Sequence, residues 1–128
     1  MLNTVYRLVA PRRFEVAFSD IQLFKENQVI VRPQFLSICH ADQRYYQGLR
    51  PAAILNKKLP MALIHESIGV VVQSCSDKVK VGDKVVMIPN TPVEKDEYIA
   101  ENYLRSSKFR ASGFDGFMQD LVALDADR

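Results

Sequence analysis

The strongest constraint on the fold of this chain is a series of short segments rich in β-branched and aromatic residues, separated by turn-forming residues. Segments of this length and composition, bounded by proline, glycine or polar clusters, are typical of β-strands. Many short strands with long irregular connections favour a mainly β fold with minor α content, built as a small β-barrel. The segments expected to form strands are residues 5–9, 14–18, 28–35, 68–72, 85–88 and 117–124.

Two short helices are expected between the third and fourth of these strands. Residues 41–47 form a helix-compatible stretch that ends at Gly48, a residue type favoured just beyond a helix C-terminus. Residues 51–58 are expected to form a further helical turn, closed by Pro60. Within the third strand, Pro33 cannot donate a ladder hydrogen bond and is therefore expected at an edge or a bulge.

Composition limits the classes of protein to which the chain can belong. Its 128 residues suffice for one domain, and 48% hydrophobic with 25% charged residues is an ordinary globular balance. The net charge of +2 predicts no nucleic-acid partner, and the absence of an apolar run of roughly 20 residues predicts no membrane segment. No secretory signal is visible, so the expected location is cytoplasmic, where Cys39 and Cys75 are free thiols or metal ligands.

Nucleotide-binding motifs are absent from the sequence. It contains neither G-x-G-x-x-G nor G-x-x-x-x-G-K-[ST], the glycine-rich patterns that cradle nucleotide phosphates. It also lacks an alternating βαβ pattern. These absences predict that the 128 residues contain no Rossmann domain of their own.

Two short segments carry residue types that bind metals. Cys39 and Asp42 lie in one, and the adjacent pair His65 and Glu66 forms the other. Zinc binds thiolate and imidazole tetrahedrally, and a nearby carboxylate can accept the spare imidazole N–H, a role that suits Asp42 toward His65. Spacing alone does not bring Cys39 and His65 together, because they are far apart in the sequence. A buried thiol and a hydrogen-bonded core histidine are the alternative interpretation.

Four motifs occur in the order SICHAD (37–42), PMALIHESIG (60–69), VGDKVV (81–86) and FDGFMQ (114–119). In these motifs the chain resembles the zinc-dependent medium-chain alcohol dehydrogenases, and the resemblance covers nearly its whole length. It implies a GroES-like, partly open β-barrel. It also implies that residues 1–128 are a GroES-like catalytic domain, the N-terminal part of a longer dehydrogenase whose Rossmann domain is absent here.

Within that family, three segments are most similar to the bacterial ribulose-5-phosphate reductases: YRLVAP (6–11), CHADQRYYQG (39–48) and NYLRSSKFR (102–110). This likeness implies an NADPH-dependent reduction of ribulose 5-phosphate to ribitol 5-phosphate. The product would feed CDP-ribitol synthesis for teichoic acid or capsule polymers. A ribitol-5-phosphate cytidylyltransferase is the implied pathway partner.

The resemblance also assigns roles to individual residues. Cys39 and His65 match zinc ligands, and Glu66 matches a carboxylate beside the metal that binds it transiently. Asp42 matches the acid that supports these ligands, and His40 matches a position at which the family often places a basic residue against the cofactor pyrophosphate. In the implied mechanism, zinc polarises the substrate carbonyl and the nicotinamide of NADPH delivers hydride.

A phosphosugar substrate also needs a cationic site. Guanidinium groups and hydroxyls suit a phosphate dianion because they offer several hydrogen-bond donors. A solvated polar loop is the alternative interpretation of the basic segment at 105–110. The candidate phosphate ligands are Arg44, Arg105, Lys108 and Arg110.

Some positions depart from the family pattern. Ile64 stands where many relatives have glycine before the metal histidine. Ala41 replaces the hydroxyl residue that begins the family's proton relay, and Arg44 replaces a histidine further along. No four-cysteine lobe occurs between residues 88 and 113, which predicts one catalytic zinc and no structural zinc. The groups that remain for the relay are Glu66, Tyr45 or Tyr46, and water.

The resemblance ends at Arg128, before the family's third zinc ligand and its cofactor-binding domain. The 128 residues alone are therefore expected to show no reductase activity, and apolar surface facing the absent domain favours a homodimer. A non-catalytic GroES-like binding or assembly module is the alternative function. Such a module has no need for Cys39, Asp42, His65 and Glu66 to converge, so the positions of these side chains distinguish the two.

Overall fold

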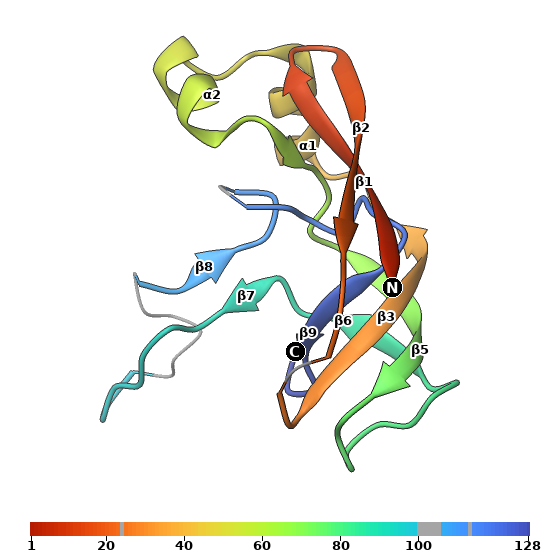
Figure 1. Cartoon of the computed structure of the whole chain (residues 1–128). Helices are drawn as coiled ribbons and strands as arrows, with labels where there is room; N and C mark the ends of the chain where they lie inside the picture. The colour runs from red at the N-terminus through yellow and green to blue at the C-terminus, as the bar shows by residue number, and fades with distance from the viewer. Residues whose placement is uncertain (24, 100–105, 113) are drawn as a thin grey trace.

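The structure, a computed structural model, describes residues 1–23, 25–99, 106–112 and 114–128 (Figure 1). Short strands dominate, as the sequence predicts, and neither of the two helices in these residues is long and apolar enough to cross a membrane. The elements in chain order are β1 (Leu2–Ala10), β2 (Arg13–Asp20), β3 (Gln28–Leu36), α1 (His40–Gln47), α2 (Ala52–Lys58), β4 (Met61–Ala62), β5 (Ser67–Ser74), β6 (Lys84–Met87), β7 (Asn90–Thr91), β8 (Lys108–Phe109) and β9 (Val122–Asp125).

Antiparallel pairing organises the described strands into three sheets. The two larger sheets have the strand orders β2-β1-β4 and β6-β5-β3-β9, and β7 pairs with β8. A bridge between Val5 and Gln119, with a hydrogen bond from the Tyr6 N–H to the Met118 carbonyl (3.1 Å), joins β1 to the segment before β9. The larger sheets are linked in this way, but the ladders of the described residues do not close into a ring. The partly open barrel is therefore confirmed.

One buried apolar cluster connects both larger sheets to α1. It includes Leu8 of β1, Val31 of β3 and Tyr45 of α1, together with Met61 and Phe117. Full burial of a large apolar side chain stabilises a fold by about 1.5–3 kcal/mol. Packing of Tyr45 into this cluster therefore fixes α1, whose N-terminus carries the candidate site, against the barrel.

Several local predictions are confirmed. α1 ends at Gly48, whose φ of +73° lies in the left-handed region that glycine adopts without strain. α2 begins after Pro51 and ends before Pro60. Pro33 borders a register shift in the β3–β5 ladder, so it occupies a bulge, one of the two environments predicted for it.

The last strand is shorter than predicted. Only Val122–Asp125 of the expected segment 117–124 forms β9. The preceding residues bond to the segment that leads to His65: the Phe117 N–H donates to the Ile64 carbonyl (2.7 Å) and the Met118 N–H donates to the Leu63 carbonyl (3.2 Å). An apolar pattern does not distinguish a regular strand from an irregular segment whose side chains are also buried.

Candidate metal centre

Cys39 lies at the N-terminus of α1. It is the N-cap residue, with extended backbone angles (φ −102°, ψ 174°). Its backbone N–H donates a hydrogen bond to Oδ2 of Asp42 (3.0 Å), which lies in the first turn of the helix. A carboxylate at this position satisfies a free backbone donor and interacts favourably with the positive end of the helix dipole. Asp42 therefore fixes the backbone that carries the thiol.

Asp42 also holds the second segment of the site. Its Oδ1 accepts a hydrogen bond from the N–H of Ile64 (2.9 Å), the residue before His65. Asp42 is only 4% exposed, so both bonds form away from water, where charge-assisted bonds are strong. The sequence predicted the imidazole N–H of His65 as the partner of Asp42. The structure instead gives the carboxylate two backbone donors, which bring the Cys39 and His65 backbones together.

Ile64 adopts a backbone conformation that β-branched residues rarely adopt. Its φ is +77°, in the left-handed region, where a residue with a side chain is strained by about 1–3 kcal/mol. Hydrogen bonds to Asp42 and from Phe117 hold it there, and its side chain is buried. The turn that orients His65 thus requires a left-handed residue. This requirement agrees with the glycine in the family pattern, although this chain has isoleucine at the position.

A second set of contacts fixes the strand that leads to His65. Asp115 accepts a hydrogen bond from the Ala62 N–H (2.9 Å), and Gly116 donates one to the Ala62 carbonyl (2.8 Å). Arg7 of β1 donates to the same Asp115 carboxylate over 2.7–3.2 Å. Burial raises the pKa of Asp115, but the bonds from Arg7 and Ala62 outweigh it, so the pKa lies below its usual range. The ionised carboxylate ties the strand to β1.

The two predicted zinc ligands lie close together. The Sγ of Cys39 and the Nδ1 of His65 are 3.7 Å apart. Two ligands of one tetrahedral zinc, at Zn–S of about 2.3 Å and Zn–N of about 2.0–2.1 Å, are separated by about 3.5 Å. The ligand atoms of Cys39, His65 and Asp42 all lie within 4.8 Å of one another. This donor set and spacing fit a zinc ion.

Burial raises the pKa of the Cys39 thiol above its usual value. Contacts with Asp42 and with backbone N–H groups of the first helical turn act in both directions and do not reverse the shift. The thiol is therefore protonated at neutral pH in the absence of a cation. Since zinc binds the thiolate, metal binding here releases a proton and strengthens as the pH rises.

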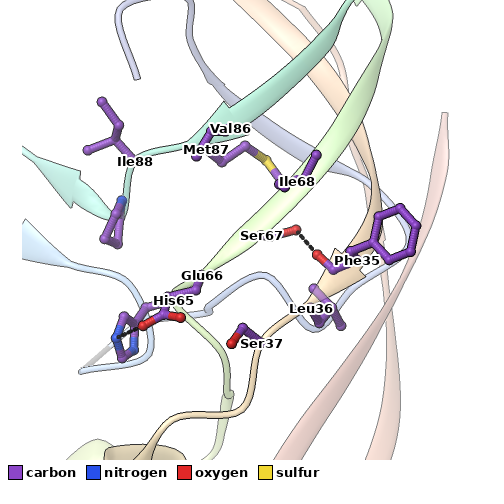
Figure 2. Close-up of a pocket in the computed structure, with 11 residues that line it drawn as sticks. Phe35, Leu36, Ser37, His65, Glu66, Ser67, Ile68, Val86, Met87 and Ile88 are labelled. Atoms are coloured by element: carbon purple, nitrogen blue, oxygen red, sulfur yellow. Dashed lines mark hydrogen bonds and ion pairs between the residues drawn. The ribbon is translucent and has the colours of Figure 1, made fainter.

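Glu66 and Phe109 lie next to the His65 ring. The Oε1 of Glu66 is 3.7 Å from Nε2 of His65 (Figure 2). The Cys39 thiol lies near the other ring nitrogen, Nδ1. The Phe109 ring is 5.2 Å from the imidazole. Figure 2 shows His65 and Glu66 at one side of a pocket whose other walls are mostly apolar and come from β3, β5 and β6. The pocket has a volume of about 560 Å³. Such a pocket beside a metal-binding cluster can hold a small molecule.

Three of the other predicted cationic residues are exposed at the surface. His40, the first residue of α1, is exposed, and so is Arg44 in the last turn of that helix. Lys108 is exposed on β8. Arg105 lies outside the described residues.

Arg110 is directed into the protein. Its guanidinium lies over the Phe114 and Phe117 rings, and it donates hydrogen bonds to the carbonyls of Asp115 and Ala123 (both 3.2 Å). Burial lowers the pKa of Arg110, and the charge of Asp115 opposes this shift. Both Nη groups thus have partners in the protein.

Sequence reasoning missed two features of the site. The dual role of Asp42 had a partial signal, because a carboxylate three residues after an N-cap position commonly bonds the N-cap backbone. The contact between Phe109 and His65 had no signal, since it joins segments that are distant in the sequence.

Fold and site together define a class of protein. A partly open antiparallel barrel carries a thiol and an imidazole, brought together at the start of its first helix, as in a metal-dependent dehydrogenase. The model of the alcohol dehydrogenase GroES-like domain matches residues 25–128, and the chain belongs to this family.

Two individual relatives within the family match the whole length of the chain. Ribulose-5-phosphate reductase 1 of Staphylococcus aureus and the ribulose-5-phosphate reductase of Bacillus spizizenii are each 58% identical to this chain over 128 residues. The match covers 100% of this chain and 37% of each reductase, so the chain spans little more than a third of their length.

Solved structures show the same similarity. The crystal structure of S. aureus TarJ in complex with NADPH matches with a TM-score of 0.75 and 45% identity, over 100% of this chain and 32% of that one. L-idonate 5-dehydrogenase from Escherichia coli matches with a TM-score of 0.83 over 99% of this chain and 38% of that one. At 24% identity, this second match supports the fold alone.

The role of Asp42 leads to a prediction for the Asp42→Asn variant. The amide offers one oxygen to two buried N–H donors, so one of them loses its acceptor. We expect a loss of about 2–3 kcal/mol in the free energy of unfolding and a 10–100-fold weaker zinc affinity. Urea denaturation and chelator competition measure these quantities. The exposed neighbour Gln43 provides a control as Gln43→Ala, and unchanged values for Asp42→Asn would contradict the role assigned to this carboxylate.

Proposed function

We propose that this chain is the metal- and substrate-binding part of a zinc-dependent oxidoreductase that reduces ribulose 5-phosphate to ribitol 5-phosphate with NADPH. The observation that carries the proposal is the 3.7 Å separation between the Cys39 thiol and the His65 imidazole. The 58% identity to two ribulose-5-phosphate reductases supports this choice of substrate. A binding or assembly module without catalysis does not need this pair of ligands.

The chain's own residues have distinct tasks in this reaction. Cys39 and His65 would hold the zinc, which would supply Lewis-acid polarisation of the substrate carbonyl. Asp42 positions both ligands through their backbones. The exposed Glu66 carboxylate beside Nε2 of His65 can hold a proton at Oε1 near the metal. The mostly apolar walls of the adjacent pocket limit the access of water to the carbonyl.

Finer assignments belong to the same proposal. Residues 1–128 act as the GroES-like catalytic domain, with one catalytic zinc and no structural zinc. His40, exposed at the start of α1, lies against the NADPH pyrophosphate. The protein works in the cytoplasm and passes ribitol 5-phosphate to a cytidylyltransferase for teichoic acid or capsule synthesis. Exposed apolar side chains outside this pocket, such as Val16 and Phe18 of β2, support a homodimer.

A chimeric enzyme tests the activity. Residues 1–128 replace the segment of S. aureus ribulose-5-phosphate reductase 1 that they match, and NADPH oxidation is followed after ribulose 5-phosphate is added. We expect reduction to ribitol 5-phosphate, no activity in the Cys39→Ser chimera, and full activity in the Cys75→Ser chimera. A folded chimera that binds NADPH but leaves ribulose 5-phosphate unreduced would overturn the proposal, as would unchanged activity in the Cys39→Ser chimera.

A further inference from the structure

Arg50 carries an unusual hydrogen-bonding group. Its Nε is buried without a hydrogen-bond partner, the one such side-chain atom among the described residues. Its guanidinium lies 4.4 Å from the centre of the Tyr45 ring, which holds the group in place without using any of its N–H donors. A buried N–H without an acceptor destabilises a protein, because its lost hydrogen bonds to water are not replaced. The position of Arg50 therefore suggests an acceptor that is not part of this chain.

The other well-packed arginines satisfy their donors within the protein. Arg7 binds the Asp115 carboxylate, and Arg110 donates to two backbone carbonyls. Within the described residues, no hydrogen bond or ion pair reaches Arg50, and its two Nη groups are not among the buried unpartnered atoms. Arg50 therefore combines a sheltered Nε with accessible Nη groups. The edge of a guanidinium formed by Nε and one Nη can bind two oxygens of a phosphate or carboxylate in parallel.

The contacts around Arg50 lead back to the metal centre. Tyr45, on which it stacks, follows Cys39 by six residues, and six residues of α-helix span roughly 9 Å. Lys58, at the far end of α2, donates to the Ser112 carbonyl (3.1 Å). That carbonyl lies just beyond β8, whose Phe109 contacts the His65 ring. Arg50 thus packs on α1, and the helix that follows it is tied at its far end to the segment after β8.

We propose that Arg50 binds the phosphate group of a phosphosugar whose carbonyl lies at the metal centre, an assignment that rests on the proposed function. Five single bonds of roughly 1.5 Å separate C2 from phosphorus in a pentulose 5-phosphate. Arg50 stacks on Tyr45 of the same helix that begins after Cys39, so a substrate lying along α1 could present its carbonyl to the metal centre and its phosphate to Arg50. Arg50 would then select phosphorylated over unphosphorylated ketoses.

Nuclear magnetic resonance of the chain tests the assignment directly. The Arg50 Nε–H signal is followed during titration with inorganic phosphate, ribulose 5-phosphate and unphosphorylated ribulose. We expect saturable shifts with the two phosphates and none with ribulose. In Arg50→Gln and Arg50→Lys, phosphate affinity should fall by about tenfold or more, because lysine keeps the charge but lacks the fork. The control Lys57→Gln removes an exposed charge from α2 and should change affinity by less than about twofold.

Kinetics separate this inference from the proposed function. In the active chimera, Arg50→Gln should raise the KM for ribulose 5-phosphate about tenfold while leaving the rate with unphosphorylated ribulose unchanged. An inactive chimera whose Arg50 signal still responds to phosphate would overturn the proposed function but not the anion site. Phosphate affinities unchanged in folded Arg50→Gln and Arg50→Lys would overturn the anion site, leaving Arg50 as a packing partner of Tyr45.

Discussion

The Gly116→Ala variant should unfold at much lower denaturant concentration than the wild-type chain. A Cβ atom at this position would lie 2.2 Å from the Ile64 carbonyl oxygen and 2.4 Å from that of Leu63. Both are backbone atoms in the segment that leads to His65, and hydrogen bonds to Phe117 and Met118 prevent them from moving away freely. We expect a loss of about 3 kcal/mol or more in the free energy of unfolding, measured by urea denaturation.

Gly82→Ala is the matched control for this prediction. Gly82 has a φ of +95°, and a Cβ atom there would meet nothing within 4 Å. The variant therefore suffers from the unfavourable backbone angle but from no steric overlap, at about 1–2 kcal/mol. If Gly116→Ala lost no more unfolding free energy than Gly82→Ala, the backbone before His65 would be able to move away from the added Cβ atom. That result would contradict the prediction.

Local features of the fold could be predicted from the sequence because they depend on neighbouring residues. The end of α1 follows from Gly48, which adopts a left-handed conformation there. The bulge in β3 follows from Pro33, which has no N–H for the ladder. The identities of Cys39 and His65 as a candidate pair could also be predicted, through the motifs that resemble zinc-dependent dehydrogenases.

The remaining features depend on contacts between distant segments. The hydrogen-bond partners of Asp42 differ from the prediction, because the fold places the Cys39 and Ile64 N–H groups against its two carboxylate oxygens. Arg110 was predicted as a phosphate ligand from its charge, yet its partners are Asp115 and Ala123. Spacing in the sequence contains no information on such partners, since chain connectivity does not constrain them.

Backbone strain at Ile64 connects the fold to the site. A left-handed isoleucine persists only where the surrounding structure determines its conformation, and here Asp42 and Phe117 bond both of its peptide groups. Residues 115–117 hold the same segment through Ala62 and Ile64. The direction in which His65 points is therefore set by α1 and by the segment before β9 together. A substitution that disturbs α1 or the segment before β9 should therefore alter the metal centre even where no metal ligand is replaced.

The Cys39→Ser variant should lose most of its zinc affinity. A serine hydroxyl stays protonated at neutral pH and is a poor zinc ligand compared with a thiolate. Four-ligand structural zinc sites have binding free energies of about 10–16 kcal/mol, so one ligand is worth roughly 3–4 kcal/mol. This corresponds to a decrease of at least about 100-fold in affinity. Competition between the chain and a chromophoric chelator measures the zinc affinity. The pH should lie above neutrality, because binding releases the Cys39 proton and is therefore stronger at higher pH.

Cys75→Ser controls for the loss of a thiol as such. Cys75 is free and exposed, and it takes no part in the cluster of Cys39, Asp42 and His65. This variant should bind zinc as tightly as the wild-type chain, with the same proton release on binding. Equal zinc affinities of the wild-type chain, Cys39→Ser and Cys75→Ser would show that zinc binds elsewhere. The thiol that lies 3.7 Å from Nδ1 of His65 would then not be a zinc ligand.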